Sequence, residues 1–114
     1  MEKIEVLYIK CGKHPEIIKI DDDLVAYQEL VDGWIDNVYP YKRDYVLVCN
    51  DEGLILHFPP NAKLEYEDGG MTIIYGDFFI AKIIDTEEGS CYGSISDADI
   101  PYLLSQIHLI GKRF

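Results

Sequence analysis

The sequence predicts an α+β fold: one domain over residues 1–114, with a mostly antiparallel sheet of six or seven short strands and two helices. Short runs of β-branched and aromatic residues recur along the chain, and most are separated by connections of hairpin length. Only two segments carry apolar residues at helical spacing. Because parallel neighbours need a crossover that is usually a helix, two helices are too few for a parallel sheet.

The composition is that of one globular unit. The chain has 114 residues, the usual length of a single domain, of which 48% are hydrophobic and 27% charged. No low-complexity linker and no internal repeat divides it. We therefore expect one hydrophobic core that needs neither disulfides nor metals.

The first third of the chain predicts a hairpin followed by a helix. Strands are expected at residues 4–10 and 16–20, because glycine and proline lie between the two runs. The three aspartates at 21–23 suit a helix N-terminus, and apolar residues at helical spacing follow over residues 24–31. Gly33 is expected to end this helix in the C′ position.

The middle of the chain predicts a second hairpin. Residues 34–39 are rich in strand formers, and residues 45–49 give the clearest strand signal in the sequence. A four-residue reversal then leads into a strand at 54–58. The prolines that follow end this strand because proline cannot donate to a ladder, and the chain up to Gly70 is polar and rich in turn residues.

Two more strands are expected in the last third, at residues 71–75 and 78–84. Gly76 and Asp77 between them fit either a tight turn or a bulge. A loop is expected at residues 85–93.

The last helix has a well-marked start. Ser96 is expected as its N-cap, with Asp99 three residues later as in a capping box. Pro101 lies late for a first turn, which favours a regular helix beginning nearer Asp99. An apolar stripe continues over residues 100–110, and Gly111 is expected to end the helix.

The charge is strongly negative, with 21 acidic residues against ten Lys and Arg and a formal net charge of −11. Such a protein repels nucleic acid and attracts basic protein surfaces, so we expect a basic protein partner and no direct nucleic-acid binding. The alternative is that the charge only maintains solubility. The acidic runs proposed as the binding surface are Asp21, Asp22 and Asp23, then Glu65, Glu67 and Asp68, and then Asp85, Glu87 and Glu88.

No motif in the sequence indicates a catalytic or metal site. His14, His57 and His108 lie in three different predicted elements, and no acidic run has the calcium-loop pattern. Cys49 is followed by acidic residues, which raise a thiol pKa and disfavour a nucleophile. We expect no enzyme activity, no cofactor and no metal; carboxylates paired in space remain an alternative, because 21 acids allow many pairs.

The sequence favours a cytoplasmic protein. It has no signal-peptide pattern and no run of about 18 apolar residues, so no membrane association is expected. Its three cysteines, Cys11, Cys49 and Cys91, are far apart in the chain, as is typical of thiols in a reducing compartment. The sequence does not determine the oligomeric state, and a homodimer is compatible with it.

The nine tyrosines are the strongest sign of a binding surface, because tyrosine contributes contact area at little entropic cost. The candidate binding residues form three groups along the chain: Tyr39, Tyr41 and Tyr45; Pro59, Pro60 and Asn61; and Phe78 and Phe79. The alternative for Phe78 and Phe79 is core packing.

Three segments carry a resemblance to a known family. They are Leu47-Val48-Cys49-Asn50-Asp51-Glu52-Gly53, then Pro59-Pro60-Asn61, then Ile73-Ile74-Tyr75-Gly76-Asp77-Phe78-Phe79-Ile80. In this order the chain resembles a family of small domains of unknown function found in phages, prophages and plasmids of mainly Gram-positive bacteria. The resemblance implies a mobile-element setting in a bacterial host and supplies no catalytic residues.

Two hypotheses of different classes follow, and a structural or interaction domain of unknown function is a further alternative. In the first, the acidic surface inhibits a host defence factor by occupying its basic nucleic-acid groove. In the second, a pocket near the Pro59 loop sequesters a nucleotide signal. The basic residues proposed for that pocket are Lys10, Lys13, Lys42, Arg43 and Lys63.

Overall fold

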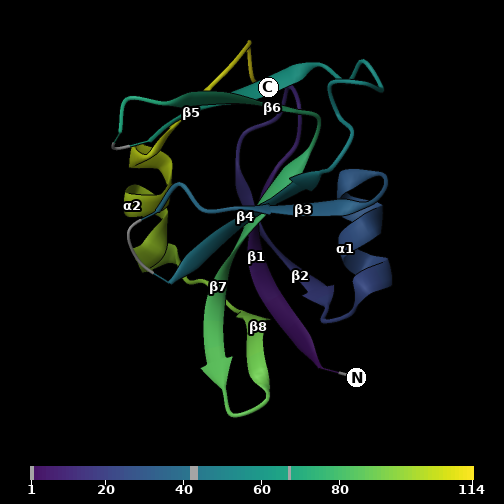
Figure 1. The fold of residues 1–114 in the computed structure, drawn as a ribbon, viewed down its shortest axis with the longest axis vertical. Helices are drawn as coiled ribbons and strands as arrows, with labels where there is room; N and C mark the ends of the chain where they lie inside the picture. The colour runs from purple at the N-terminus through teal and green to yellow at the C-terminus, as the bar shows by residue number, and fades with distance from the viewer. Residues whose placement is uncertain (1, 42–43, 67) are drawn as a thin grey trace.

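The chain folds into two antiparallel sheets that pack face to face, with one helix beside each sheet (Figure 1). The computed structural model describes residues 2–41, 44–66 and 68–114. Its elements in chain order are β1 (Lys3–Ile9), β2 (Glu16–Asp21), α1 (Leu24–Val31), β3 (Ile35–Val38), β4 (Tyr45–Asn50), β5 (Pro60–Glu65), β6 (Met71–Tyr75), β7 (Phe78–Thr86), β8 (Gly89–Gly93), the 3-10 turn η1 (Asp97–Asp99), α2 (Ile100–Ser105) and β9 (Ile107–Leu109).

The larger sheet has the strand order β2-β1-β7-β4-β3, with β8 paired to the second half of β7. The smaller sheet has the order β6-β5-β9. Every strand pair in the described part of the chain is antiparallel, which confirms the predicted class, although nine strands exceed the six or seven expected. The radius of gyration, 13.4 Å, is close to the roughly 13 Å expected for a domain of this length.

The central part of the larger sheet is buried on both faces, and this produces two apolar clusters. One face contributes Leu7, Leu47 and Phe78 to a cluster beneath the small sheet and α2. The other contributes Val48 and Phe79 to a cluster beneath α1. Because β4 and the start of β7 are covered on both faces, their sequences are continuously apolar instead of alternating.

The prediction of a strand at residues 54–58 is wrong. Residues 51–57 form a series of turns, in which the Leu56 amide donates to the Glu52 carbonyl and the Phe58 amide to the Gly53 carbonyl. Both edges of β4 are already paired, with β3 on one side and β7 on the other, so a returning strand has no edge to join. The loop's apolar side chains are consequently exposed, Leu54 by 63% and Ile55 by 73%.

Three strands were not predicted. β5 lies within the segment expected to be polar and turn-rich, where Pro60 takes the first position of a strand, a place that proline tolerates. β8 lies within the expected loop at 85–93 and forms a hairpin with β7. β9 replaces the end of the last helix, which stops at Ser105 instead of continuing to residue 110.

Both helix starts agree with the prediction. Asp23 caps α1 by accepting a bond from the Ala26 amide, and Ser96 with Asp99 forms the expected capping box. The end of α1 differs, because the left-handed residue is Asp32, with φ of 59°, and not Gly33. No helix among the described residues is long and apolar enough to cross a lipid bilayer.

Candidate functional site

The two faces of the larger sheet are unequally covered, and the less covered face contains a groove. The small sheet and α2 cover one face, whereas α1 covers only part of the other (Figure 1). Two adjoining depressions of about 370 and 320 Å³ lie on the second face and share Asn37, Ser90, Cys91 and Tyr92. We call this region the open-face groove, and its polar and aromatic lining is Asp22, Tyr27, Asn37, Tyr39, Asp44, Asp85, Ser90 and Tyr92.

Strand alternation explains why these side chains meet. Ile83 pairs with Tyr92 and Asp85 with Ser90 across the β7–β8 hairpin, so all four project from the same face. The Tyr92 hydroxyl donates to the Asn37 side-chain oxygen on β3 and thereby joins the two sides of the groove. Burial raises the pKa of Tyr92, so its hydroxyl remains a donor at neutral pH.

The carboxylates of the groove have no basic neighbour among the described lining residues. Asp22 accepts a hydrogen bond from the Tyr27 hydroxyl, and Asp85 accepts one from the Ser90 hydroxyl at 2.7 Å. Burial and the Asp22 carboxylate raise the pKa of Tyr27, which keeps that hydroxyl protonated as a donor. The described lining of the groove is therefore acidic, and among the described residues the side-chain partners of Asp22 and Asp85 are neutral hydroxyls.

Aromatic rings border these carboxylates. Tyr27 and Tyr92 pack edge to face with ring centroids 4.9 Å apart, and Tyr39 at the end of β3 is 57% exposed. Carboxylates beside aromatic faces suit a lysine or arginine side chain, which can pair with the acid and lie on the ring. In the described part of the chain no three His, Cys, Asp or Glu side chains form a cluster that could bind a metal.

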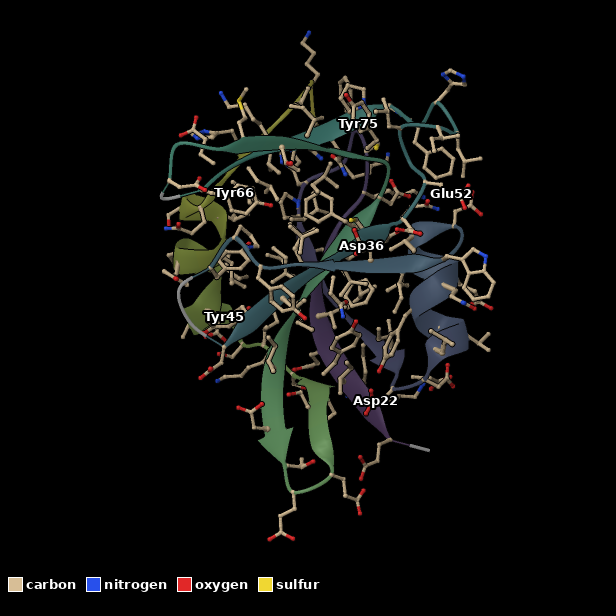
Figure 2. The ribbon with its side chains drawn as sticks, viewed as in Figure 1. Asp22, Asp36, Tyr45, Glu52, Tyr66 and Tyr75 are labelled. Carbon is tan, nitrogen blue, oxygen red and sulfur yellow. The ribbon has the colours of Figure 1, made fainter. Side chains whose placement is uncertain are left out.

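Of the predicted aromatic binding residues, only Tyr39 reaches this surface. Tyr41 and Tyr45 are buried, and Tyr41 donates to the Leu103 carbonyl of α2 and Tyr45 to Asp99. Figure 2 shows Tyr45 at the start of β4. Phe78 and Phe79 are fully buried on opposite faces of the sheet. These four residues belong to the core, in keeping with the alternative given for the two phenylalanines.

The Pro59 loop divides into an exposed and a buried part. Pro59 and Pro60 are exposed, whereas Asn61 is completely buried. The Asn61 side-chain amide donates to the carbonyls of Ile9 at 2.8 Å and Gly76 at 2.9 Å. Its side-chain oxygen accepts from Arg113 at 2.6 Å, so Asn61 joins the small sheet to the larger sheet and to the C-terminal segment.

The basic residues proposed for a nucleotide pocket do not line one in the described part of the chain. Arg113 donates to the carbonyls of Lys10 and Lys13, which brings these segments together near Asn61. The adjacent cavity of about 150 Å³ is lined by Cys11, Phe58, Pro59 and the acidic Asp32 and Asp77, among others, and by no basic residue that is described. Lys63 instead pairs with Glu65 at 3.3 Å; Lys42 and Arg43 lie outside the described residues.

The predicted acidic runs are divided among several places. Asp22 and Asp85 line the open-face groove, and Glu87 and Glu88 extend the acidic surface to the turn of the β7–β8 hairpin. The others have local partners: Asp21 pairs with Lys3, Asp23 caps α1, Glu65 lies near Lys63 and His108, and Asp68 accepts from the Gly70 amide. Glu67 lies outside the described residues.

Five polar or aromatic residues of the groove were not among the candidates from the sequence: Tyr27, Asn37, Asp44, Ser90 and Tyr92. Residues 85–93 were interpreted as a loop, so the alternation that places Ser90 and Tyr92 on one face could not be applied. Recognising Glu87 and Glu88, followed by Gly89, as the two-residue turn of a hairpin would have identified both.

The motifs of this chain resemble those of a family of small domains of unknown function. Comparison with known proteins tests whether the chain belongs to such a family. No protein with curated annotation and no solved structure gives a significant match to the chain. A family model described as Domain of unknown function (DUF3846) matches residues 3–108, and the chain therefore belongs to this family.

Proposed function

We propose that this domain is a binding protein without enzymatic activity, and that its open-face groove binds the basic surface of another protein. The observation that carries the proposal is the pairing of exposed carboxylates, Asp44 and Asp85, with tyrosine rings in a groove whose described lining contains no basic residue. The net charge of −11 steers basic proteins toward the molecule.

The mobile-element setting implied by the motif resemblance favours one form of this proposal. In that form the partner is a host defence factor, and the groove and the β7–β8 hairpin occupy the site where it binds nucleic acid. Glu87 and Glu88 at the hairpin turn supply further negative charge next to Asp85.

The first experiment uses a fluorescein-labelled peptide of twelve alternating arginine and glycine residues, followed by fluorescence anisotropy at low salt. Asp44→Asn combined with Asp85→Asn is expected to weaken binding about 5- to 30-fold, the effect of losing one or two kcal/mol of ion pairing. The matched control, Glu29→Gln combined with Glu65→Gln, changes the net charge equally but outside the groove. We expect it to change affinity less than about twofold.

Equal weakening by both double variants would mean that net charge alone binds the peptide, and the groove would lose its assigned role.

A second experiment addresses the partner class. Immobilised domain in low salt should retain nucleic-acid-binding proteins from a bacterial lysate and release them as salt rises, because the contacts are between exposed charges. Partners retained equally by the Asp44→Asn, Asp85→Asn variant would contradict the proposal.

A further inference from the structure

In the described part of the chain, each sheet has an edge strand on the same side of the molecule. β3 is the last strand of the larger sheet and β6 the last strand of the smaller one. A groove of about 200 Å³ lies between them; its lining includes Asp36 and Val38 from β3 and Thr72, Ile73, Ile74 and Tyr75 from β6. It opens on the opposite face of β3 from the open-face groove, because Asp36 and Asn37 are consecutive strand residues. Figure 2 shows Asp36 between β3 and the small sheet.

The free edge of β6 has backbone groups that can pair with another strand. The Tyr66 amide donates to the Gly70 carbonyl, so in the continuing β5–β6 ladder the hydrogen-bonded pairs are Leu64 with Thr72 and Ala62 with Ile74. The residues between them, Met71 and Ile73, therefore direct their N–H and C=O groups away from β5. No other strand in the described part of the chain pairs with that edge.

The position of Gly53 supports this assignment of the β6 backbone groups that point away from β5, and it limits the length of the free edge. A Cβ atom on Gly53 would lie 2.6 Å from the Tyr75 carbonyl oxygen, so the loop after β4 packs directly against that carbonyl. Tyr75, like Met71 and Ile73, thus directs its carbonyl away from β5, as the alternation requires. The loop covers the edge at Tyr75 and leaves it open at Met71 and Ile73.

The lining of the groove indicates what kind of segment fits it. Its volume of about 200 Å³ is below the roughly 300–1,000 Å³ of small-molecule sites and suits one or two side chains. Val38, Leu54 and Ile74 supply apolar surface, and Asp36 and Asp51 are acids in a lining that contains no described basic residue. A second copy of this chain, with the same net charge of −11, would be repelled.

We propose that β6 accepts an extended segment of another protein as a fourth strand of the small sheet. An apolar side chain of that segment enters the groove, and a neighbouring lysine or arginine pairs with Asp36 or Asp51. Main-chain hydrogen bonds to Met71 and Ile73 supply affinity, and the groove supplies specificity. This site does not depend on the open-face groove, and the two are tested by different variants.

The test begins with selection of random twelve-residue displayed peptides against the whole chain, followed by synthesis of the enriched peptides. Ile73→Pro removes an N–H that points away from β5, a place where proline is tolerated, so the fold should persist while binding falls at least about tenfold. Asp36→Asn combined with Asp51→Asn should weaken binding of peptides with Lys or Arg about fivefold or more. The open-face variant, Asp44→Asn with Asp85→Asn, should bind these peptides as the natural chain does.

Amide hydrogen exchange measured by NMR gives a readout that does not require any variant to fold. The Met71 and Ile73 amides should exchange rapidly in the free protein and become protected when an enriched peptide binds. Protection of Ile73 in the free protein, a failure to enrich any peptide, or peptides that bind without protecting it would overturn the proposal. A homodimer that Ile73→Pro converts to a monomer would also overturn it, by identifying a second copy as the occupant.

Discussion

Replacing Asn61 by alanine should destabilise the domain strongly, because this side chain joins the two sheets. Asn61 is completely buried, and its amide donates to the carbonyls of Ile9 on β1 and Gly76 between β6 and β7. Both of those residues are buried as well, so water cannot readily replace the lost donor. The Gly76 carbonyl loses its side-chain donor at a cost of about 1–3 kcal/mol, whereas Ile9 also lies opposite Phe78 in the β1–β7 ladder and loses one of two bonds, about 1 kcal/mol, so the total is about 2–4 kcal/mol.

Urea unfolding followed by circular dichroism measures this loss. With a slope of about 1.5 kcal/mol per molar urea, a loss of about 3 kcal/mol lowers the unfolding midpoint by about 2 M. Domains of this kind are stable by about 5–15 kcal/mol, so the variant should still fold in the absence of urea.

Arg113→Met provides the control for the Asn61 prediction. It removes the guanidinium that contacts the Asn61 oxygens at 2.6 and 2.8 Å but leaves both amide donations in place. Its effect should be smaller than that of Asn61→Ala, because the Lys10 and Asn61 main-chain carbonyls keep the Lys13 and Ile110 amides as donors, and the Asn61 side-chain oxygen is the only acceptor on a buried residue that loses its described donor. If Asn61→Ala lowers the stability by less than about 1 kcal/mol, the two carbonyls are not dependent on this side chain and our account of how the sheets are joined is refuted.

Two further predictions concern titration and thiol chemistry. The pKa of Asp99 is lowered, and the hydrogen bond from Tyr45 is the largest cause. This hydrogen bond therefore stabilises the fold at neutral pH, and its contribution disappears as the pH falls through the lowered pKa of Asp99. Tyr45→Phe should therefore be less stable than the natural chain at pH 7, and the difference in urea midpoint should narrow below about pH 4; a constant difference would contradict the assignment. Burial raises the pKa of Cys49 to about 12 and that of Cys11 to about 11, whereas Cys91 is exposed. N-ethylmaleimide at pH 7 should modify Cys91 first in the folded protein, as peptide mass mapping can verify, and earlier modification of Cys49 would be inconsistent with its burial.

The sequence predicted local structure well where one segment determines it. Asp23 before α1 and Ser96 with Asp99 before α2 each meet the needs of the helix start within four residues. The antiparallel class was also predictable, because it follows from counting helices that could act as crossovers. These inferences do not depend on which strands become neighbours in space.

Errors arose where pairing partners decide the structure. Residues 54–58 have the composition of a strand, but β3 and β7 occupy both edges of β4. Conversely, β5 begins with a proline and was not predicted, although it became the central strand of the small sheet. The open-face groove was only partly predicted for the same reason: Tyr39 and Asp85 approach each other through β3, β4 and β7, which are far apart in the sequence.

The exposed loop after β4 has a consequence for the surface proposed at β6. Three consecutive apolar side chains at residues 54–56 are about half or more exposed, as is Trp34 at 69%, an arrangement that favours aggregation unless something opposes it. Asp51 and Glu52 are the first two residues of the loop, where like charges on two copies repel each other. The same acids attract a basic partner. Asp51 and Glu52 therefore oppose self-association and also favour binding of a strand from a different, basic protein. Neutralising Asp51 and Glu52 together should therefore increase aggregation measured by light scattering while it weakens binding of lysine-containing peptides, and a change in only one of these properties would separate the two roles.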